Sequence, residues 1–452
     1  MTASASVKSQ SSGAMEQTVS AALARIATHD GRVGAFTDVT ADRAVAAARA
    51  QDASGAGGPL AGVTFAAKNL FDIAGLPTRA GSKINRERAP AERDAELVRR
   101  MEAAGAVLLG GLNMGEYAYD FTGENVHDGP SRNPHDLTRM TGGSSGGSGA
   151  AVAAGFVDVA LGSDTNGSIR VPSALCGCFG LKPTYGRLTR AGTFPFVHSF
   201  DHVGPLARSV RLLSLAYDAM QGPDAADAAT TTRDPEPATA SLEDGVAGLR
   251  IATLGGYFAE KGEPDCFEAV ARVANSLGAD RAVTLPEAAR ARAAAYVISA
   301  TEGAALHLDR LRTRPDDFDP AVRDRLIAGA TVPAAFVAQA QRFRRWFAGA
   351  VAKAFEEVDI LIAPATPCRA PKLGQTTFTL GGETLPVRPN LGLFTQPISF
   401  IGLPVAAVPV WLDDGLPLGV QIIAPPWREA DALRVARALE RDGVAGVRVP
   451  AF

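Results

Sequence analysis

Several features that mark other protein classes are scarce in this chain. Only 4 of its 452 residues are cysteines, too few for a disulfide framework, and their spacing lacks the paired pattern of a zinc site. We therefore expect reduced, buried thiols at Cys176, Cys178, Cys266 and Cys368. Neither charge sign is in excess, because 45 basic residues stand against 48 acidic ones. Without a long run of Lys or Arg, we expect no direct binding of nucleic acid.

Long apolar runs are also missing. No stretch approaches the roughly 18 apolar residues of a transmembrane helix, and the first residues lack the apolar segment of a secretory signal. We therefore expect a cytoplasmic protein outside the membrane. Residues 1–14, rich in Ser and Ala, are expected to be disordered, with an ordered helix beginning at Met15. The remainder, in a chain that is 46% hydrophobic and 21% charged, indicates a globular protein with a large core.

Helical patterns alternate with short apolar runs. Residues 94–104 place Leu97, Val98 and Met101 on one face, and the strand-like run 106–110 follows at once. Similar apolar runs occur at 157–161, 249–254, 358–363, 405–410 and 419–423. This alternation predicts an α/β fold, with a large mixed sheet covered by helices on both faces.

The chain is predicted to form one domain over residues 15–452. Two helices packed by one face are expected within 16–50, with a loop over 51–59. Residues 222–245, rich in Ala, Thr, Asp and Pro, predict a surface crossing from a front part to a back part at 246–452. Within the back part, residues 269–354 have a helical pattern that is interrupted at 314–315 and 332–333.

Two clusters of Gly and Ser carry the candidate chemistry. The first reads Gly-Gly-Ser-Ser-Gly-Gly-Ser-Gly over 142–149, and it leads directly into an apolar helical segment, which a flexible linker does not do. The second, Asp-Thr-Asn-Gly-Ser-Ile-Arg over 164–170, follows an apolar strand, so Ser168 is expected just beyond a strand end. Gly167 permits a tight turn whose backbone N–H groups converge, as an oxyanion hole requires.

A serine nucleophile needs a base, and the usual histidine is not evident. There is no G-x-S-x-G elbow, and the six histidines are scattered. Lys68 follows an apolar run, where loss of solvent favours the neutral amine. Taken alone, a lysine in this position is more typical of a solvated strand end.

Together these segments resemble the amidase signature family. The resemblance runs through 142–147, 160–170, 180–187 and 199–205, and reappears at 402–404 and 415–421, so it covers most of the chain. It implies an amidase signature fold and a hydrolase of linear amide carbon–nitrogen bonds, with no metal or organic cofactor.

The resemblance also assigns roles to residues. It implies that Ser168 is the acylated nucleophile, that Ser144, after a cis peptide, bridges it to the base, and that Lys68 is that base. The remaining roles implied are an oxyanion hole made by the backbone N–H groups of Thr165, Asn166, Gly167 and Ser168, and supporting contacts from Ser145, Asp164 and Arg170. Asn69 departs from the family, where Asp often follows the lysine, but a neutral neighbour favours the neutral amine.

Two groups within the family resemble the chain most. Residues 116–125 and 129–134 are similar to the glutaminase subunit of the tRNA-dependent amidotransferase, yet 296–314 lacks the D-G-x-R-Y-G pattern of that subunit. Asn166 and the segments 68–72, 387–392, 396–400 and 425–428 look more like the 1-carboxybiuret hydrolases of s-triazine (cyanuric acid) degradation.

The second resemblance implies a small carboxylated urea as substrate and release of ammonia. A cation should then meet the substrate carboxylate, for which Arg388 is a candidate, although a surface salt bridge explains it equally well. An oligomeric assembly with a small helical partner subunit is also implied. A general aliphatic or aryl amidase stays open as an alternative, whereas intact Lys68, Ser144 and Ser168 disfavour a scaffold without catalysis.

Overall fold

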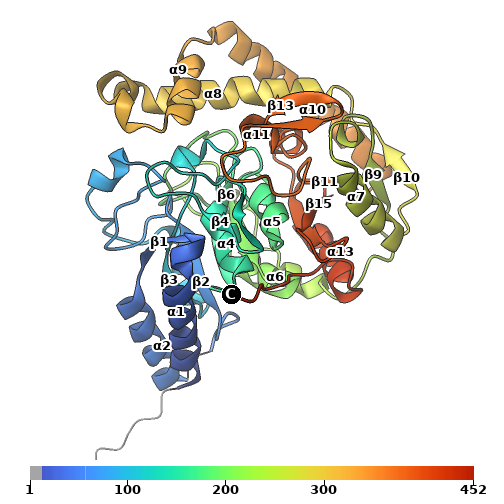
Figure 1. The fold of residues 1–452 in the computed structure, drawn as a ribbon. Coiled ribbons are helices and arrows are strands. Elements are labelled where there is room, and N and C mark those ends of the chain that lie inside the picture. Colours follow the sequence, from blue (N-terminus) through green and yellow to red (C-terminus); the bar gives the residue numbers. More distant parts are fainter. Residues whose placement is uncertain (1–12, 56) are drawn as a thin grey trace, which may run out of the picture.

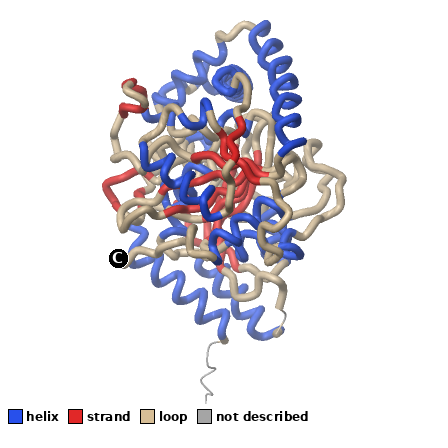
Figure 2. Tube along the Cα trace, turned by 90° about the vertical axis from the view of Figure 1, so that its right-hand side faces the viewer, coloured by secondary structure: helices blue, strands red, loops and turns tan. Residues whose placement is uncertain are grey.

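The computed structural model describes residues 13–55 and 57–452. The expectation of disorder over 1–14 falls mostly outside these residues, and the first helix begins at Ala14. The centre is an 11-stranded sheet (Figures 1 and 2). Its strands are, in spatial order, β1 (Phe36–Val39), β3 (Val107–Leu112), β2 (Thr64–Lys68), β6 (Val159–Asp164), β8 (His202–Ala207), β7 (Phe179–Lys182), β14 (Val405–Val410), β15 (Leu418–Ile423), β11 (Ile360–Pro364), β9 (Ile251–Leu254) and β10 (Arg281–Val283).

The sheet is mixed, as the sequence predicts. Strand β2 pairs in parallel with β3 and β6, and β9 pairs in parallel with β10 and β11, while the other neighbours are antiparallel. Each predicted apolar run forms a strand of this sheet. The front and back parts both contribute strands to it, and the segment 222–245 between them is largely exposed, with one 3₁₀ turn at Ala238–Ser241. Two small hairpins lie outside the sheet: β4 (Arg132–Asn133) with β5 (Asp136–Met140), and β12 (Thr377–Leu380) with β13 (Glu383–Pro386).

Helices cover both faces of the sheet, because alternate residues of a strand face opposite sides. In β2, Phe65 and Ala67 enter the larger core cluster, whereas Ala66 enters the cluster that contains α1, α2 and α4. The covering helices are α1 (Ala14–Val33), α2 (Ala41–Ser54), α4 (Gly146–Ala153) and α5 (Arg170–Cys176) on this second side, and α3 (Glu96–Ala103), α6 (Val210–Met220) and α13 (Glu429–Arg441) on the first. Helix α7 (Pro264–Ser276) packs against β11 and β15.

A helical arm extends from the sheet layer and lies at the top of Figure 1. We use this name for α8 (Ala288–Thr313), α9 (Pro320–Ala330) and α10 (Ala334–Glu357). Both predicted interruptions are present, since α8 ends before Arg314-Pro315 and α10 begins after Pro333. The short helices α11 (Val387–Asn390) and α12 (Gln396–Ser399) connect the hairpin β12–β13 to β14.

Some predictions about elements are wrong. Helix α2 continues to Ser54, into the segment expected to be a loop, because its Ala-rich sequence favours helix up to Gly55, which closes it in the left-handed conformation. Strand β10 interrupts the stretch expected to be helical.

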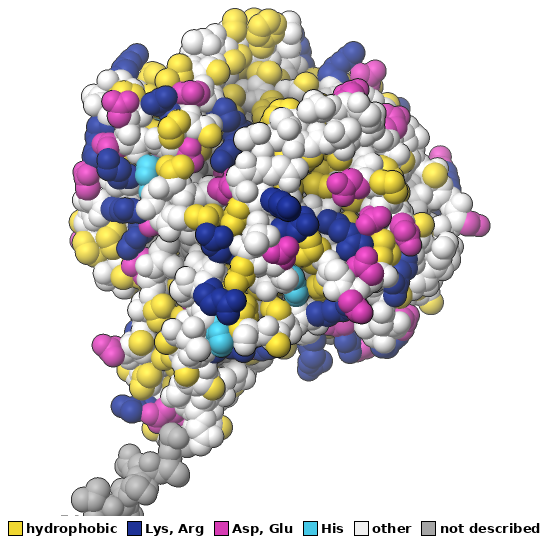
Figure 3. All heavy atoms as spheres, viewed as in Figure 1, with side chains coloured by type: hydrophobic (Ala, Val, Ile, Leu, Met, Phe, Trp, Pro, Cys, Tyr) yellow, Lys and Arg dark blue, Asp and Glu magenta, His cyan; other side chains and the backbone are white. Residues whose placement is uncertain are grey.

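The surface agrees with the balanced charge. On the face shown in Figure 3, Lys and Arg side chains are interspersed with Asp and Glu. None of the helices within the described residues is both long and apolar enough to cross a membrane.

Candidate active site

Lys68 is the last residue of β2 and is fully buried. Ala66, two residues earlier, faces the side of the sheet that α4 covers, and the Lys68 side chain reaches the segment before that helix. Its Nζ lies 2.7 Å from Ser144 Oγ, 2.9 Å from Ser145 Oγ and 2.8 Å from Ser163 Oγ. The structure therefore brings together the predicted base and the predicted bridging serine, and it adds Ser163, which sequence reasoning did not single out.

Burial sets the protonation of this amine. Loss of solvent lowers the pKa of Lys68 to about 7, although the carboxylates of Asp164, Asp201 and Asp120 act in the opposite direction. A neutral amine has two N–H donors and one lone pair, so one of its three hydroxyl neighbours must donate to it. Ser145 already donates to the Ser163 carbonyl at 3.1 Å. The Ser144 hydroxyl, at the shortest distance, is then the donor best placed to give its proton to Lys68.

The loop before α4 is held by close backbone packing. The peptide bond between Gly143 and Ser144 is cis, as the resemblance implies. A Cβ on Gly143 would lie 2.8 Å from the backbone nitrogen of Gly123 and 2.9 Å from Asp120 Oδ2, so only glycine fits. The glycines of this run therefore serve close approach, and the run is not a flexible linker.

Ser168 lies between β6 and α5, in the turn that follows the strand end, and is 2% exposed. Its backbone carbonyl accepts from the Ser145 N–H at 3.3 Å, which places the two serine loops side by side. Among the described residues, the Ser168 hydroxyl has no hydrogen-bond partner, and the contact from Ser144 to Ser168 that proton transfer needs is not formed in this structure.

The backbone of the same turn offers free donors. The N–H groups of Thr165, Asn166, Gly167 and Ser168 donate to no acceptor in the described part of the chain. Gly167 has a φ of +144°, and a Cβ there would lie 2.2 Å from Thr395 Oγ1. Successive N–H groups without acceptors, next to the predicted nucleophile, have the chemistry that an oxyanion hole requires.

A buried ion pair between Asp164 and Arg170 lies next to this turn. Asp164 accepts from the backbone of Ile169 at 3.2 Å and from Arg170 Nε at 3.0 Å, and both charged side chains are fully buried. Burial raises the pKa of Asp164, but the charge and hydrogen bonds of Arg170 outweigh it and hold that pKa below its usual range. Arg170 continues to Gln421 Oε1 at 2.7 Å. The contacts of Asp164 and Arg170 are thus with the backbone and side chains around this turn.

A small cavity of about 10 Å³ lies against Ser168. That volume holds about one water molecule, so a substrate enters only when side chains around it move. The cavity is lined by the turn that contains Ser168, by the loop at 118–121, by two residues of the helical arm, and by Phe196 and Gln396. The lining residues are Ala118, Tyr119, Asp120, Phe121, Thr165, Asn166, Ser168, Phe196, Tyr296, Arg325 and Gln396.

The cation in this cavity is Arg325 and not Arg388. Arg388 binds Asp120 at 2.5 Å, so its charge is already paired, and it does not line the cavity. Arg325, from α9, donates to the Tyr119 carbonyl at 2.8 Å, and its guanidinium lies 3.5 Å from the centre of the Tyr119 ring. Both of these contacts are with Tyr119, and the guanidinium takes part in none of the salt bridges between described residues. Sequence analysis missed Arg325. It is one of two arginines in α9, and nothing in the local sequence distinguishes it from a surface residue.

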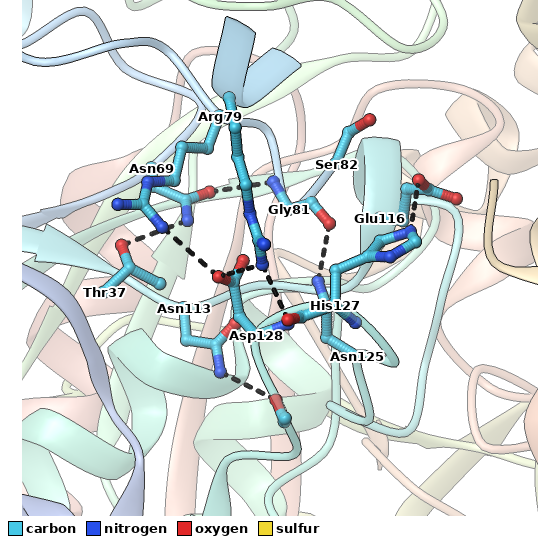
Figure 4. A network of polar contacts seen from close by, with 12 residues as sticks. Thr37, Asn69, Arg79, Gly81, Ser82, Asn113, Glu116, Asn125, His127 and Asp128 are labelled. Carbon is cyan, nitrogen blue, oxygen red and sulfur yellow. Dashed lines mark hydrogen bonds and ion pairs between the residues drawn. The ribbon is translucent and has the colours of Figure 1, made fainter. Parts of the chain in front are cut away.

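The departure at Asn69 has a structural explanation. Asn69 accepts from the Gly81 N–H at 3.0 Å and donates to Thr37 at 3.2 Å, within the polar network of Figure 4. In the same network Glu116 binds His127 Nε2 at 3.0 Å. The network ties the loops after β2 and β3 to each other. Asn69 therefore positions backbone and makes no contact with the Lys68 amine.

The cysteines are buried and unpaired, as expected, and burial raises the pKa of each thiol. Within the described residues there is also no cluster of His, Cys, Asp or Glu that would hold a metal ion.

Comparisons with known proteins agree with this geometry. The Amidase family model matches residues 17–433. The AtzE subunit of 1-carboxybiuret hydrolase from Pseudomonas sp. (strain ADP) is 55% identical over 433 residues, 94% of this chain and 95% of that protein. A glutamyl-tRNA(Gln) amidotransferase subunit from Anaeromyxobacter sp. (strain K) is 39% identical over 458 residues, covering 94% and 92%.

Solved structures give the same relationships. One, described as a vestigial protein complex that reveals the evolutionary origins of an s-triazine catabolic enzyme, superimposes with a TM-score of 0.95 at 54% identity, covering 96% of both chains. The corresponding amidotransferase subunit from Thermotoga maritima has a TM-score of 0.81 at 30% identity, covering 97% and 95%. The chain belongs to the amidase signature family and is a hydrolase of carbon–nitrogen bonds.

Proposed function

We propose that the protein deaminates 1-carboxybiuret by a Ser168–Ser144–Lys68 acyl-enzyme mechanism. The observation that carries the choice of substrate class is the unpaired guanidinium of Arg325 in the cavity beside Ser168. A cation that lines the same small pocket as the nucleophile suits a substrate with one carboxylate and one amide. The 55% identity to a 1-carboxybiuret hydrolase subunit, against 39% to an amidotransferase subunit, supports the carboxylated urea.

The reaction divides into acylation and hydrolysis. Ser168 Oγ attacks the terminal carbonyl while its proton passes to Ser144 Oγ, and the Ser144 proton passes to neutral Lys68. The N–H groups of residues 165–168 stabilise the oxyanion. Collapse of the tetrahedral intermediate breaks the carbon–nitrogen bond, and the leaving nitrogen takes the proton back from Lys68 through Ser144, so ammonia departs. Water then attacks the acyl-enzyme by the same route and releases a dicarboxylated urea.

The second candidate is a glutaminase that supplies ammonia to a larger assembly. Glutamine also carries a carboxylate and a carboxamide, and the relationship to amidotransferase subunits favours it. A general aryl amidase is less suited, because the cavity is small and holds a cation.

The test is ammonia release by the purified chain. Carbamic acids lose CO₂ in water, so 1-carboxybiuret is best generated continuously in the assay by hydrolytic ring opening of cyanuric acid. Glutamine, biuret, allophanate and benzamide are assayed in parallel, with Ser168→Ala as the control. We expect serine-dependent release from 1-carboxybiuret. Release only from glutamine would show that the protein is a glutaminase. Undiminished release of ammonia by the Ser168→Ala variant would contradict the mechanism.

We also propose that the chain works in an assembly with a small helical partner. The described relative is a protein complex. Large apolar side chains are exposed on the helical arm, among them Phe336 at 54% and Trp346 at 50%. The molar mass of the protein isolated from its own cells tests this proposal, and a bare monomer of 46.8 kDa would contradict it.

A further inference from the structure

This inference rests on the proposed function and concerns how the site distinguishes its two candidate substrates. In 1-carboxybiuret and in glutamine, the carboxylate and the carboxamide occupy the two ends of a five-atom chain. Ser168 and Arg325 therefore fit both molecules equally well. The middle of the chain differs, because 1-carboxybiuret has N–H groups and a carbonyl where glutamine has methylenes and an ammonium. Selection must come from groups that contact this middle part.

Asn166 has an unpaired acceptor beside the nucleophile. The side chain lines the cavity together with Ser168, two residues further along the chain, and is only 6% exposed. Its Oδ1 is buried and has no hydrogen-bond partner among the described residues. A buried acceptor without a donor lowers stability, so such atoms are rare and usually await a ligand or a water molecule.

The orientation of this amide is fixed. Asn166 Nδ2 donates to Ser299 Oγ of α8 at 2.9 Å, and the Asn166 carbonyl accepts from Thr395 Oγ1 at 2.7 Å. With the NH₂ group held by Ser299, the oxygen of the same amide remains as the free acceptor.

A free donor accompanies it. Gln396 lines the same cavity and is 1% exposed, and its Oε1 accepts from Arg292 Nε at 2.7 Å. That contact turns the Gln396 oxygen toward Arg292 and leaves its NH₂ group without an acceptor in the described part of the chain. One acceptor and one donor thus line the cavity, the pair needed to bind the N–H and C=O of a ureido group.

We propose that Asn166 selects for carboxylated ureas: its Oδ1 accepts a hydrogen bond from the N–H next to the scissile carbonyl, and the Gln396 NH₂ group donates to the middle carbonyl. A methylene at the first position offers no hydrogen to Asn166 and leaves the acceptor unpaired. Glutamine and other ω-carboxamide acids are therefore discriminated against, although their two ends fit the site.

The test compares 1-carboxybiuret with glutaramate, the monoamide of glutaric acid, which has the same chain length and both end groups but no internal N–H. The quantity measured is the ratio of their kcat/KM values, or of their affinities as competitive inhibitors if glutaramate is not turned over. In Asn166→Ala we expect the preference for the ureido compound to fall by about tenfold to a hundredfold. Ser299→Ala, which frees the amide to rotate but leaves it in place, should give a smaller fall in the same direction.

The outcomes separate this inference from the proposed function. If the wild-type chain releases no ammonia from 1-carboxybiuret, the proposed function is wrong, and the proposed selectivity of Asn166 for this substrate is wrong with it. If the wild type is active and the ratio is unchanged in Asn166→Ala, only the role of Asn166 is overturned. An equal loss with both compounds would show that the residue merely supports the nucleophile turn, and would overturn the role as well.

Discussion

At the scale of single residues, the proposed mechanism requires that the protonation of Lys68 determine whether Ser168 can be activated. The base must be neutral, and burial lowers the pKa of Lys68 to about 7. We therefore predict that the rate at which a fluorophosphonate probe labels Ser168 rises about tenfold per unit up to pH 7 and is constant above pH 8. Lys68→Met should label at least a hundredfold more slowly. A rate that continues to rise to pH 10 would show a lysine with its ordinary pKa of about 10.4, and would contradict a buried base.

Arg325 gives the second prediction at this scale. Arg325→Met removes the cation that lines the cavity, and we expect KM for 1-carboxybiuret to rise by about tenfold to a hundredfold, because charge-assisted hydrogen bonds contribute about 1.5–3 kcal/mol. The rate of probe labelling at Ser168 should change far less, since the probe has no carboxylate. Arg388→Met is the comparison, and a larger rise in KM for that variant would return the carboxylate-binding role to Arg388.

At the scale of elements, the turn between β6 and α5 depends on the buried pair of Asp164 and Arg170. Arg170→Met leaves a buried carboxylate without its partner, and we expect the free energy of unfolding to fall by about 3–5 kcal/mol. Urea denaturation measures this change. Arg441→Met, at an exposed pair with Asp442, is the control and should have little effect. Equal stability of the two variants would mean that the buried pair does not hold the turn.

The helical arm carries Arg325, and Glu116 fastens it to the site. Glu116 Oε2 accepts from the backbone N–H of Asp319 at 2.7 Å, at the first turn of α9. We predict that Glu116→Ala raises KM for 1-carboxybiuret several-fold, because α9 no longer holds Arg325 in place. Asp316→Ala, on an exposed side chain of the same arm, should leave KM unchanged. If both variants behave alike, Glu116 does not position the arm.

The sequence predicted long apolar elements better than short ones. Runs such as 405–410 and 419–423 have enough branched apolar residues to predict strands without further context. Strands β7 and β8 were missed because they contain Lys182, His202 and a Gly-Pro pair, whose places in a sheet depend on neighbours distant in the chain.

Only part of the candidate site could be predicted from the sequence. Ser144 and Ser168 lie in continuous motifs, and the resemblance to the family identified Lys68 with them. The Arg325 guanidinium reaches the cavity because α9 packs beside the loop that contains Tyr119, and no local pattern encodes that approach. The salt bridge of Arg388, which the sequence left open as an alternative, is formed with Asp120 and could not be assigned in advance, because it joins two loops far apart in sequence.

At the scale of the whole molecule, a single sheet joins the front and back parts of the chain. Strands from before residue 222 form one half of it and strands from after residue 245 form the other, and the two halves meet where β7 pairs with β14. We therefore predict one cooperative unfolding transition. All three tryptophans, Trp346, Trp411 and Trp427, lie in the back part, so their fluorescence reports that part, whereas far-UV circular dichroism reports the whole chain. Two transitions at different urea concentrations would indicate two domains.

The central claim is that Ser168 carries the acyl group from which the amide nitrogen has departed. The most direct measurement is to mix the enzyme with 1-carboxybiuret, stop the reaction with acid within milliseconds, and locate the adduct by peptide mass mapping. We predict an acyl group on the peptide that contains Ser168 in the wild-type protein, and no adduct with Ser168→Ala. An adduct on another side chain, or steady release of ammonia by the Ser168→Ala variant, would contradict the account.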